Sequence, residues 1–455
     1  MSLSELVRRR RRRRGARAAV IAALALVMAG ATLPAAAADG TPGSQDGRLV
    51  GKLVMPKGSD KDTWQELTRR QLKSDDGEKS TRTLHEAAHE QRKATVASQN
   101  DEPEPPPAQR TKAAYDYYSW DQCRAHDPGD DNEQEVRRKN HFAFCLVSRP
   151  TYRFYRYIWG RPVLVGEYQF RLTMLGRGER GVQRIRFDLE LDDWDGWGIR
   201  DSKAPLGIRL SCLNLVNAEC DEIGGGRQDT ISGWQFNGNA YASFITTRSE
   251  GGGDGVHYDQ DRVNYHDMRI RLTSATGSTQ FEEPFRCDAA AYASGGGCIF
   301  DQVPATMHYS LNGAGVDSVA AHIKKAQDDP ANVYPGGVGT EIPGARKSGK
   351  PLTRLYPGMD EEARLYYNAN NRVVRTTCRE RDPNWGTPGM QCDEYPFRST
   401  WEGAHYTEVQ PGARWKYSAR MVDGEENGNA GSALGAWYTE DHILAKDAFW
   451  VQINP

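Results

Sequence analysis

The sequence predicts a mainly β N-terminal domain of the sandwich type, followed by a small α+β domain and preceded by a segment that forms no core. Three observations support this prediction. Apolar and polar residues alternate with period two in several runs between residues 111 and 282. The segment before these runs is poor in aromatic residues, and the segment after them combines a helical pattern with a buried-strand pattern. Alternation is typical of half-buried strands, whereas a segment with few apolar residues cannot bury a core.

The first 38 residues have the pattern of an export signal. Seven consecutive arginines, Arg8 to Arg14, precede the apolar run from Ala18 to Leu33, and small side chains follow at 36–38. A basic head, an apolar middle and a small-residue exit predict a cleaved signal peptide and a secreted protein. A basic arm for nucleic acid and a single membrane anchor are the alternatives. Apart from this run the chain has no long apolar stretch, so a multi-span membrane protein is excluded.

Removal of this signal changes the net charge of the protein. Residues 1–38 carry eight Arg and one Glu, a net of +7, and the whole chain has a formal charge of −2, so the mature chain carries −9. A chain this acidic has no overall basic footprint for nucleic acid. Residues 39–110 contain a single aromatic residue, Trp64, and end in a proline-rich run at 103–107. We expect this segment to be a disordered linker or propeptide.

Residues 111–282 are expected to form an antiparallel β-sandwich of unknown role. Period-two alternation is clear at 167–174, 182–189 and 268–272, and glycine-rich turns separate the runs. In such a strand one side chain enters the core and the next faces water.

Eight cysteines follow the signal, and they fall into neighbouring pairs. An exported chain meets an oxidising compartment, so an even number of cysteines predicts disulfides. Short loops are the easiest to close, which favours sequential pairing over the other combinations. A zinc site is disfavoured because no Cys-x-x-Cys pair is present. The expected disulfides are Cys123–Cys145, Cys212–Cys220, Cys287–Cys298 and Cys378–Cys392.

Residues 283–455 are expected to form the small α+β domain. Residues 317–326 predict a short helix that Asp317 caps, with Val319, Ile323 and Ala326 on one face. Residues 447–453 predict a buried closing strand.

Three short motifs resemble known sites, but their surroundings do not suit the function. His85 to His89 spells the H-E-x-x-H pattern of zinc proteases, in a segment without the aromatic residues that would build a dry wall around the metal. A metalloprotease remains an alternative on this motif alone. Gly176 to Gly181 matches a dinucleotide-binding pattern, but a strand follows it where a helix is needed, so we expect a hairpin turn. Asp193 to Gly196 resembles part of a calcium loop, and we expect an ordinary turn.

Acidic and amide side chains gather near glycine turns in the last 80 residues. They include Asp393, Glu394, Glu402, His405 and Asn427. Oxygen ligands of this kind suit hard divalent cations, and a bound cation can acidify water and offset charge on a phosphoryl oxygen. His405 or a glutamate is then a candidate general base. The same residues also suit a plain solvent-exposed surface.

The order and spacing of these blocks resemble the NucA/NucB family of secreted bacterial deoxyribonucleases. The resemblance covers about residues 290–455 and rests on separate blocks in the same order. These blocks are Asp393-Glu394-Tyr395-Pro396-Phe397, Glu402-Gly403, Asn427 with Ala430-Gly431-Ser432, the His322-Ile323 helix and Asp447-Ala448-Phe449-Trp450-Val451. The chain departs from the pattern at Gln391, where short members carry an acid, and at Gly428-Asn429, where they carry Arg-Gly.

The resemblance implies a metal-dependent endodeoxyribonuclease that hydrolyses DNA phosphodiester bonds outside the cell. Asp393 and Glu394 are then the acidic centre, and Glu402 is a second carboxylate for metal binding or base catalysis. These three residues are the expected ligands of Mg²⁺ or Mn²⁺. Asn427 is expected to orient a phosphate or a ligand. His322 is either part of the site or a helix side chain beside the core residue Ile323.

DNA is the expected substrate, and neither a stable protein partner nor membrane contact after signal removal is expected. Residues 285–455 hold 17 Lys or Arg against 21 Asp or Glu, which predicts weak, salt-sensitive contact with DNA. The main alternative is a non-catalytic exported protein whose aromatic-rich sandwich binds glycan or cell wall, although aromatic residues commonly belong to the core.

Overall fold

The structure is a computed structural model of the chain, and it describes residues 47–54, 116–129, 133–214, 219–247, 257–293, 295–412 and 415–455. The predicted signal peptide and the H-E-x-x-H motif lie outside the described residues. In the described part, none of the helices combines the length and the apolar character that a bilayer-spanning helix requires.

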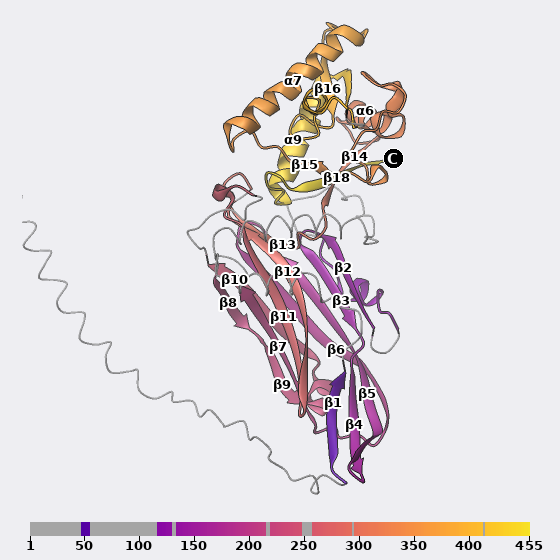
Figure 1. The fold of residues 1–455 in the computed structure, drawn as a ribbon, viewed down its shortest axis with the longest axis vertical. Coiled ribbons are helices and arrows are strands. Elements are labelled where there is room, and N and C mark those ends of the chain that lie inside the picture. Colours follow the sequence, from indigo (N-terminus) through magenta and orange to yellow (C-terminus); the bar gives the residue numbers. More distant parts are fainter. Residues whose placement is uncertain are drawn as a thin grey trace, which may run out of the picture.

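The larger sheet of the N-terminal domain has eight antiparallel strands (Figure 1). Its main path runs β1-β4-β5-β6-β10-β8, while β3 also pairs with β5 and β2 pairs with β3. The strands are β1 (Leu49–Val54), β2 (Gln134–Asn140), β3 (Ala143–Ser148), β4 (Thr151–Ile158), β5 (Arg161–Gly178), β6 (Arg184–Gly198), β8 (Glu219–Gly224) and β10 (Asn239–Thr247).

A second sheet of five antiparallel strands packs against the first. Its order is β13-β12-β11-β7-β9. The strands are β7 (Pro205–Asn214), β9 (Gly226–Thr230), β11 (Asn264–Ser274), β12 (Gly277–Asp288) and β13 (Gly297–Ile299), and the short helices of this domain are α4 (Trp120–Arg124), α5 (Ile231–Phe236) and the 3₁₀ turn Asp259–Asp261. Phe187 and Phe244 of the first sheet contact Phe285 of the second, with ring centroids 6.4 Å apart in both pairs. One aromatic-rich core between two sheets confirms the predicted sandwich.

The period-two runs lie in long strands, as the sequence predicts. Residues 167–174 belong to β5, residues 184–189 belong to β6, and residues 268–272 belong to β11. The dinucleotide-like motif lies at the β5–β6 connection, as expected for a hairpin. The calcium-like motif was wrongly expected to be a turn, because Asp193 to Gly196 lies inside β6, where the register with β5 shifts.

The sandwich extends further along the chain at both ends than residues 111–282. Strand β12 crosses position 282, and its partner β13 belongs to the same sheet. Strand β1 comes from the segment that we expected to lack structure. It pairs with β4 over six positions, from Leu49 opposite Arg156 to Val54 opposite Thr151, and Leu53 is buried in the core. Strand β1 was not predicted, because residues 39–110 as a whole contain few apolar residues.

Four disulfides join the cysteines in sequential order, as predicted, and no described cysteine is free. Cys378–Cys392 is the one in the C-terminal domain, where it joins a helix to a strand.

The C-terminal domain has the predicted small α+β architecture. Its strands are β14 (Ala305–Ser310), β15 (Leu352–Thr353), β16 (Met390–Tyr395), β17 (Ser418–Asp423) and β18 (Ala448–Asn454), and its helices are α6 (Asp317–Asp328), α7 (Glu361–Arg381), α8 (Tyr406–Val409), α9 (Gly424–Glu440) and the 3₁₀ turns Pro330–Asn332 and Arg346–Ser348. The closing strand β18 lies between parallel β14 and antiparallel β15. Helix α6 forms as predicted, although Val316, not Asp317, is its N-cap and makes no side-chain cap.

Charged residues connect the two domains. Arg286 of β12 donates to both carboxylate oxygens of Asp447, and its Nη2 also donates to the carbonyl of His442. His442 in turn lies 3.2 Å from the carboxylate of Asp288, which is also in β12. Arg286 and His442 are fully buried. A buried charge needs partners of this kind, so the interface holds the domains in a defined orientation.

Candidate active site

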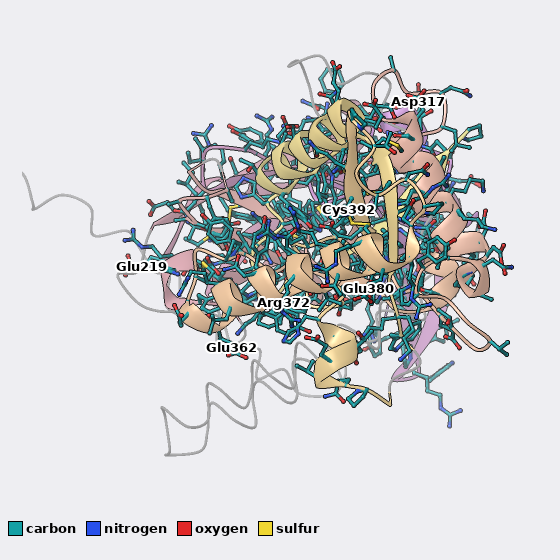
Figure 2. The ribbon with its side chains drawn as sticks, turned by 90° about the horizontal axis from the view of Figure 1, so that it is seen from above. Glu219, Asp317, Glu362, Arg372, Glu380 and Cys392 are labelled. Carbon is teal, nitrogen blue, oxygen red and sulfur yellow. A yellow bond between two sulfur atoms is a disulfide. The ribbon has the colours of Figure 1, made fainter. Side chains whose placement is uncertain are left out.

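The antiparallel pair β16–β17 presents two faces, and different helices cover them. Side chains alternate along each strand, and paired positions share a face. Tyr395 and Val422 pack with α6 and α9, whereas Ala419 and Met421 pack with α7. We call these the α6–α9 face and the α7 face. In Figure 2, α7 with its labelled residues and Asp317 at the start of α6 lie on opposite sides of Cys392.

Asp393 lies on the α6–α9 face and is held by a histidine. The Nδ1 atom of His322 on α6 is 2.6 Å from Oδ2 of Asp393, and its Nε2 atom is 2.8 Å from the hydroxyl of Ser418 on β17. His322 is fully buried, while Asp393 keeps 7% of its surface exposed. The other carboxylate oxygen of Asp393 has no hydrogen-bond partner among the described residues. The histidine therefore fixes the carboxylate and leaves one oxygen for a ligand.

The chain Ser418–His322–Asp393 has the connectivity of a serine hydrolase triad, in which one imidazole nitrogen binds the acid and the other the hydroxyl. A nucleophile must reach its substrate, and Ser418 is only 1% exposed. Its hydroxyl is therefore a fixed partner that orients His322, and acyl transfer is not a function that this geometry supports.

A second carboxylate, Glu426, lies on the same side of the domain. It belongs to the first turn of α9, and its Oε2 accepts a hydrogen bond of 2.6 Å from the backbone N–H of Ser318. Ser318 and His322 are four residues apart on α6, so they lie on one face of that helix, one turn apart. Glu426 and Asp393 thus contact successive turns of the same helix face. The second oxygen of Glu426 has no partner within the described residues.

Asn427 joins this group through Gln391. Its amide nitrogen is 3.3 Å from Oε1 of Gln391, which precedes Asp393 by two positions on β16 and therefore shares its face. Asn427 was predicted as a site residue, and its amide oxygen remains available as a ligand atom.

Arg420 supplies a positive charge on this face. It pairs directly with Asp393 across the β16–β17 ladder, so the two side chains leave the sheet on the same side. Arg420 is exposed and makes no ion pair with the described residues. A guanidinium that no carboxylate occupies is available to bind a phosphate through two hydrogen bonds.

Glu394 points to the opposite face. One of its oxygens accepts a hydrogen bond of 3.2 Å from the backbone N–H of Arg398, whose guanidinium binds Tyr367 and Asn368 on α7. Burial and then the charge of Asp393, against the opposing effect of Arg398, together raise the pKa of Glu394 to about 8. Adjacent residues of a strand face opposite ways, so the structure does not bring the expected Asp393–Glu394 pair together in one site.

Glu402 and His405 make their contacts with other elements, Glu402 with Thr353 of β15 and His405 with Tyr366 of α7. Glu402 accepts hydrogen bonds from the backbone N–H and the hydroxyl of Thr353, at 2.7 and 3.1 Å, and burial raises its pKa. His405 lies 2.7 Å from Glu408, and its ring packs edge-on against Tyr366 of α7. Both oxygens of Glu402 are thus engaged, which makes it a structural anchor of the 350–354 loop.

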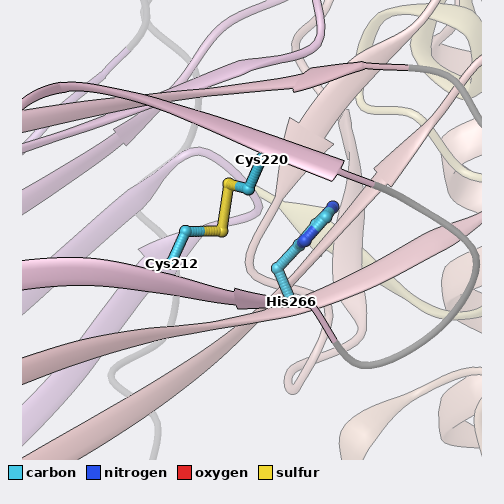
Figure 3. Close-up of side chains that lie close together, drawn as sticks. All are labelled: Cys212, Cys220 and His266. Atoms are coloured by element: carbon cyan, nitrogen blue, oxygen red, sulfur yellow. A yellow bond between two sulfur atoms is a disulfide. The ribbon is translucent and has the colours of Figure 1, made fainter.

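Among the described residues, the one group of three His, Cys, Asp or Glu ligand atoms that lie within 4.8 Å of one another is in the sandwich (Figure 3). It consists of Cys212, Cys220 and His266. The two cysteines form a disulfide, and His266 lies 3.0 Å from the hydroxyl of Thr246. Metals bind thiolates, which a disulfide lacks, so this group is not a metal site while the bond is intact.

The α6–α9 face therefore holds two carboxylates with unshared oxygens, one amide oxygen and one exposed guanidinium. Mg²⁺ and Mn²⁺ take oxygen ligands, often one or two carboxylates with water and phosphate completing the shell, and this set fits such an ion. The residues that the sequence prediction missed are Glu426 and Arg420. Glu426 directly precedes the predicted site residue Asn427, but helix α9, which positions it, was not predicted, and the pairing that places Arg420 beside Asp393 is visible only in the structure.

The family model described as Deoxyribonuclease NucA/NucB matches residues 345–452 of the chain. This match confirms the resemblance that the sequence blocks indicate, and it shows that the C-terminal part of the chain is similar to deoxyribonuclease domains. Asp393, Arg420, Glu426 and Asn427 lie inside the matched residues, while Ser318 and His322 precede them. No curated protein matches the chain.

Proposed function

We propose that the NucA/NucB deoxyribonuclease domain at residues 345–452 makes this protein a secreted, metal-dependent endodeoxyribonuclease whose active centre is the α6–α9 face. The observation that carries the proposal is the convergence of Asp393 and Glu426 on successive turns of α6, each with one oxygen unshared among the described residues. Asp393 was an expected metal ligand. Glu426 takes the place that the sequence analysis gave to Glu394 and Glu402.

Asp393, Glu426 and the amide oxygen of Asn427 are the groups that would hold a divalent cation. Such an ion, when bound, acidifies water and offsets negative charge on a phosphoryl oxygen. His322 and Ser418 fix the orientation of Asp393, as outer partners of metal ligands commonly do. Glu394, with its pKa near 8, is protonated at neutral pH and is a poor ligand under those conditions.

Arg420 would bind the DNA phosphate. The hydrogen bond between Ser318 and Glu426 joins the first turns of α6 and α9, but the acidic side chains of Asp317, Asp423 and Glu425 offset the positive ends of these helix dipoles. The exposed guanidinium of Arg420 is therefore the cation that this face offers to DNA. One such contact supports transient, salt-sensitive binding, as expected for an enzyme that releases its product.

Secretion is supported by the four disulfides, which persist in oxidising compartments outside the cytoplasm. The glycan-binding alternative receives no specific support from the ten aromatic residues of the sandwich that are buried in the described core, because they pack between its sheets.

The test uses the predicted mature chain, residues 39–455, on supercoiled plasmid, which has no ends and is therefore cut only by an endonuclease. We expect nicking with Mg²⁺ or Mn²⁺, none with chelator, and a loss of at least about 100-fold in Asp393→Asn and Glu426→Gln. Glu394→Gln, on the α7 face, and His405→Gln, whose ring packs against α7, are the matched controls and should keep most of the activity. Full activity in Glu426→Gln would reject the proposed centre, and chelator-resistant nicking would reject the metal.

A further inference from the structure

An exposed apolar surface lies at the end of the sandwich remote from the C-terminal domain, where β4 and β5 meet (Figure 1). It consists of residues 155–165 and 195–203 with the adjoining Arg48, and we call it the hairpin tip. Its exposed large apolar side chains are Ile158, Trp159, Val163, Leu164, Trp197 and Ile199. Trp159 at the turn is 90% exposed. Soluble proteins seldom leave so many apolar side chains together in water without a function.

Strand pairing brings these residues together at one end of the sandwich. Ile158 pairs with Arg161 across the β4–β5 turn, Val163 pairs with Arg156, and Leu164 pairs with Tyr155 at the next position of the same ladder. The backbone N–H of Ile199 donates to the carbonyl of Val165, so the end of β6 lies against β5 at the same level. The six apolar residues therefore surround the β4–β5 turn and the end of β6, and because Val163 and Leu164 are adjacent in β5 they expose apolar groups on both faces of the tip.

The turn itself places an indole at the apex. Trp159 has φ of 52° and Gly160 has φ of 71°, and a two-residue hairpin turn with two positive φ angles normally carries Asn or Gly at the first position. A bulky residue is unfavourable there. The turn is therefore strained at Trp159, and this conformation leaves the indole almost fully exposed at the end of the hairpin.

The hairpin tip is basic, in contrast to the rest of the chain. It holds five cationic residues, Arg48, Arg156, Arg161, Arg200 and Lys203, and two acidic ones, Asp195 and Asp201, which gives a net charge of +3. The predicted mature chain carries −9. An anionic partner is therefore attracted to this end of the molecule and repelled by most of the remaining surface.

We propose that the hairpin tip binds the surface of an anionic lipid bilayer. Aliphatic side chains insert into the acyl boundary, tryptophan prefers the headgroup level, and arginines pair with anionic headgroups. A sugar-binding surface would instead offer flat aromatic rings with polar groups around them, and four of these six side chains are aliphatic. The proposal departs from the expectation of no membrane contact after signal removal. It is independent of the proposed nuclease centre, which lies in the other domain.

The experiment measures co-sedimentation of residues 39–455 with vesicles of phosphatidylglycerol and phosphatidylcholine, and with vesicles of phosphatidylcholine alone. We expect binding to the anionic vesicles that weakens with salt, and little binding to neutral ones. Trp159→Asn removes the indole and keeps a residue that tolerates positive φ, so the fold is retained. It should lower the partition coefficient roughly tenfold. Trp385→Ser, at an exposed tryptophan of the C-terminal domain, is the control and should bind like the parent protein.

The proposal would be overturned if the protein did not bind anionic vesicles, or if Trp159→Asn and the parent protein partitioned equally. It would also be overturned if the protein bound purified cell wall but no vesicles, and Trp159→Asn abolished the binding to cell wall. Plasmid nicking by Trp159→Asn should equal that of the parent. A failure of vesicle binding with intact nicking thus refutes the lipid surface alone, and the converse refutes the nuclease centre alone.

Discussion

Arg286 and Asp447 form a buried, two-point ion pair between the sandwich and the C-terminal domain. The Nη1 and Nη2 atoms of Arg286 lie 2.7 and 2.9 Å from the two oxygens of Asp447, and His257 lies 2.9 Å from the first of these oxygens. Asp447 directly precedes the central strand β18, and Arg286 belongs to β12. The core strands of both domains are thereby connected through one charged contact.

The Asp447→Asn variant should be strongly destabilised. It leaves the guanidinium of Arg286, which is 1% exposed, without its counter-charge, and removal of one partner of a buried pair costs about 3–5 kcal/mol. Urea unfolding at pH 7 measures this loss. Glu361→Gln, which breaks the exposed pair with Arg364, is the control and should change the free energy of unfolding by less than about 0.5 kcal/mol. Equal stability of the two variants would contradict the assignment.

The contribution of Asp447 should disappear in acid. Burial alone would raise the pKa of Asp447, but the charges of Arg286 and His257 outweigh burial and hold it well below its usual range. Above the unfolded-state value, near 4, the carboxylate is ionised in both states and the pair contributes in full. As pH falls through the folded-state value, the native carboxylate is protonated and the contribution is lost. The stability difference between parent and Asp447→Asn should therefore shrink below pH 4, and a constant difference down to pH 2 would contradict this prediction.

Arg420→Gln should weaken substrate binding and leave the fold intact, since the residue is exposed. Loss of one phosphate contact raises KM by roughly fivefold and lowers the slope of log(kcat/KM) against log[salt] by about 1. Arg372→Gln removes an exposed cation of helix α7 and is the matched control. If both variants show the same salt dependence as the parent protein, Arg420 does not contact the phosphate.

His322→Gln should impair metal use more than DNA binding. His322 contacts the carboxylate that we propose as a ligand, and loss of such an outer partner commonly costs 10–100-fold in metal affinity or activity. Titration of nicking activity with Mn²⁺ should show a higher half-saturating concentration with KM for DNA near its original value. A purely structural role of His322 would lower stability without changing that concentration.

The sandwich was predictable because the patterns that specify it lie within single strands and between cysteines close in sequence. Alternation along β5, β6 and β11 records which side chain enters the core, and short sequence separations favour the cysteine pairs that form. Strand β1 escaped prediction because its few apolar residues lie within a polar segment. They gain a core only through pairing with β4, about 100 positions further along the chain.

The site was only partly predictable because it depends on which face of a short ladder each residue occupies. Asp393 and Glu394 are neighbours in sequence, yet the alternation of β16 sends them to opposite sides. Glu426 and His322 are about 100 residues apart, yet α6 contacts Asp393 and Glu426 at successive turns. The sequence blocks indicate the chemistry of a family. The register of β16 with β17 determines which residues of those blocks lie on the same face and can form one site.

The pairing of β1 has a consequence for the behaviour of the chain towards proteases. Residues 55–115 separate β1 from the next described residue of the sandwich. Strand β1 is bound to the sheet by its ladder with β4 and by the hydroxyl of Thr276, which donates to the carbonyl of Gly51. A cut within 55–115 would leave two polypeptides that co-purify under native conditions and separate in denaturant. The amino-terminal fragment would then complete the sheet in trans, and a synthetic peptide of residues 47–54 would compete for its place.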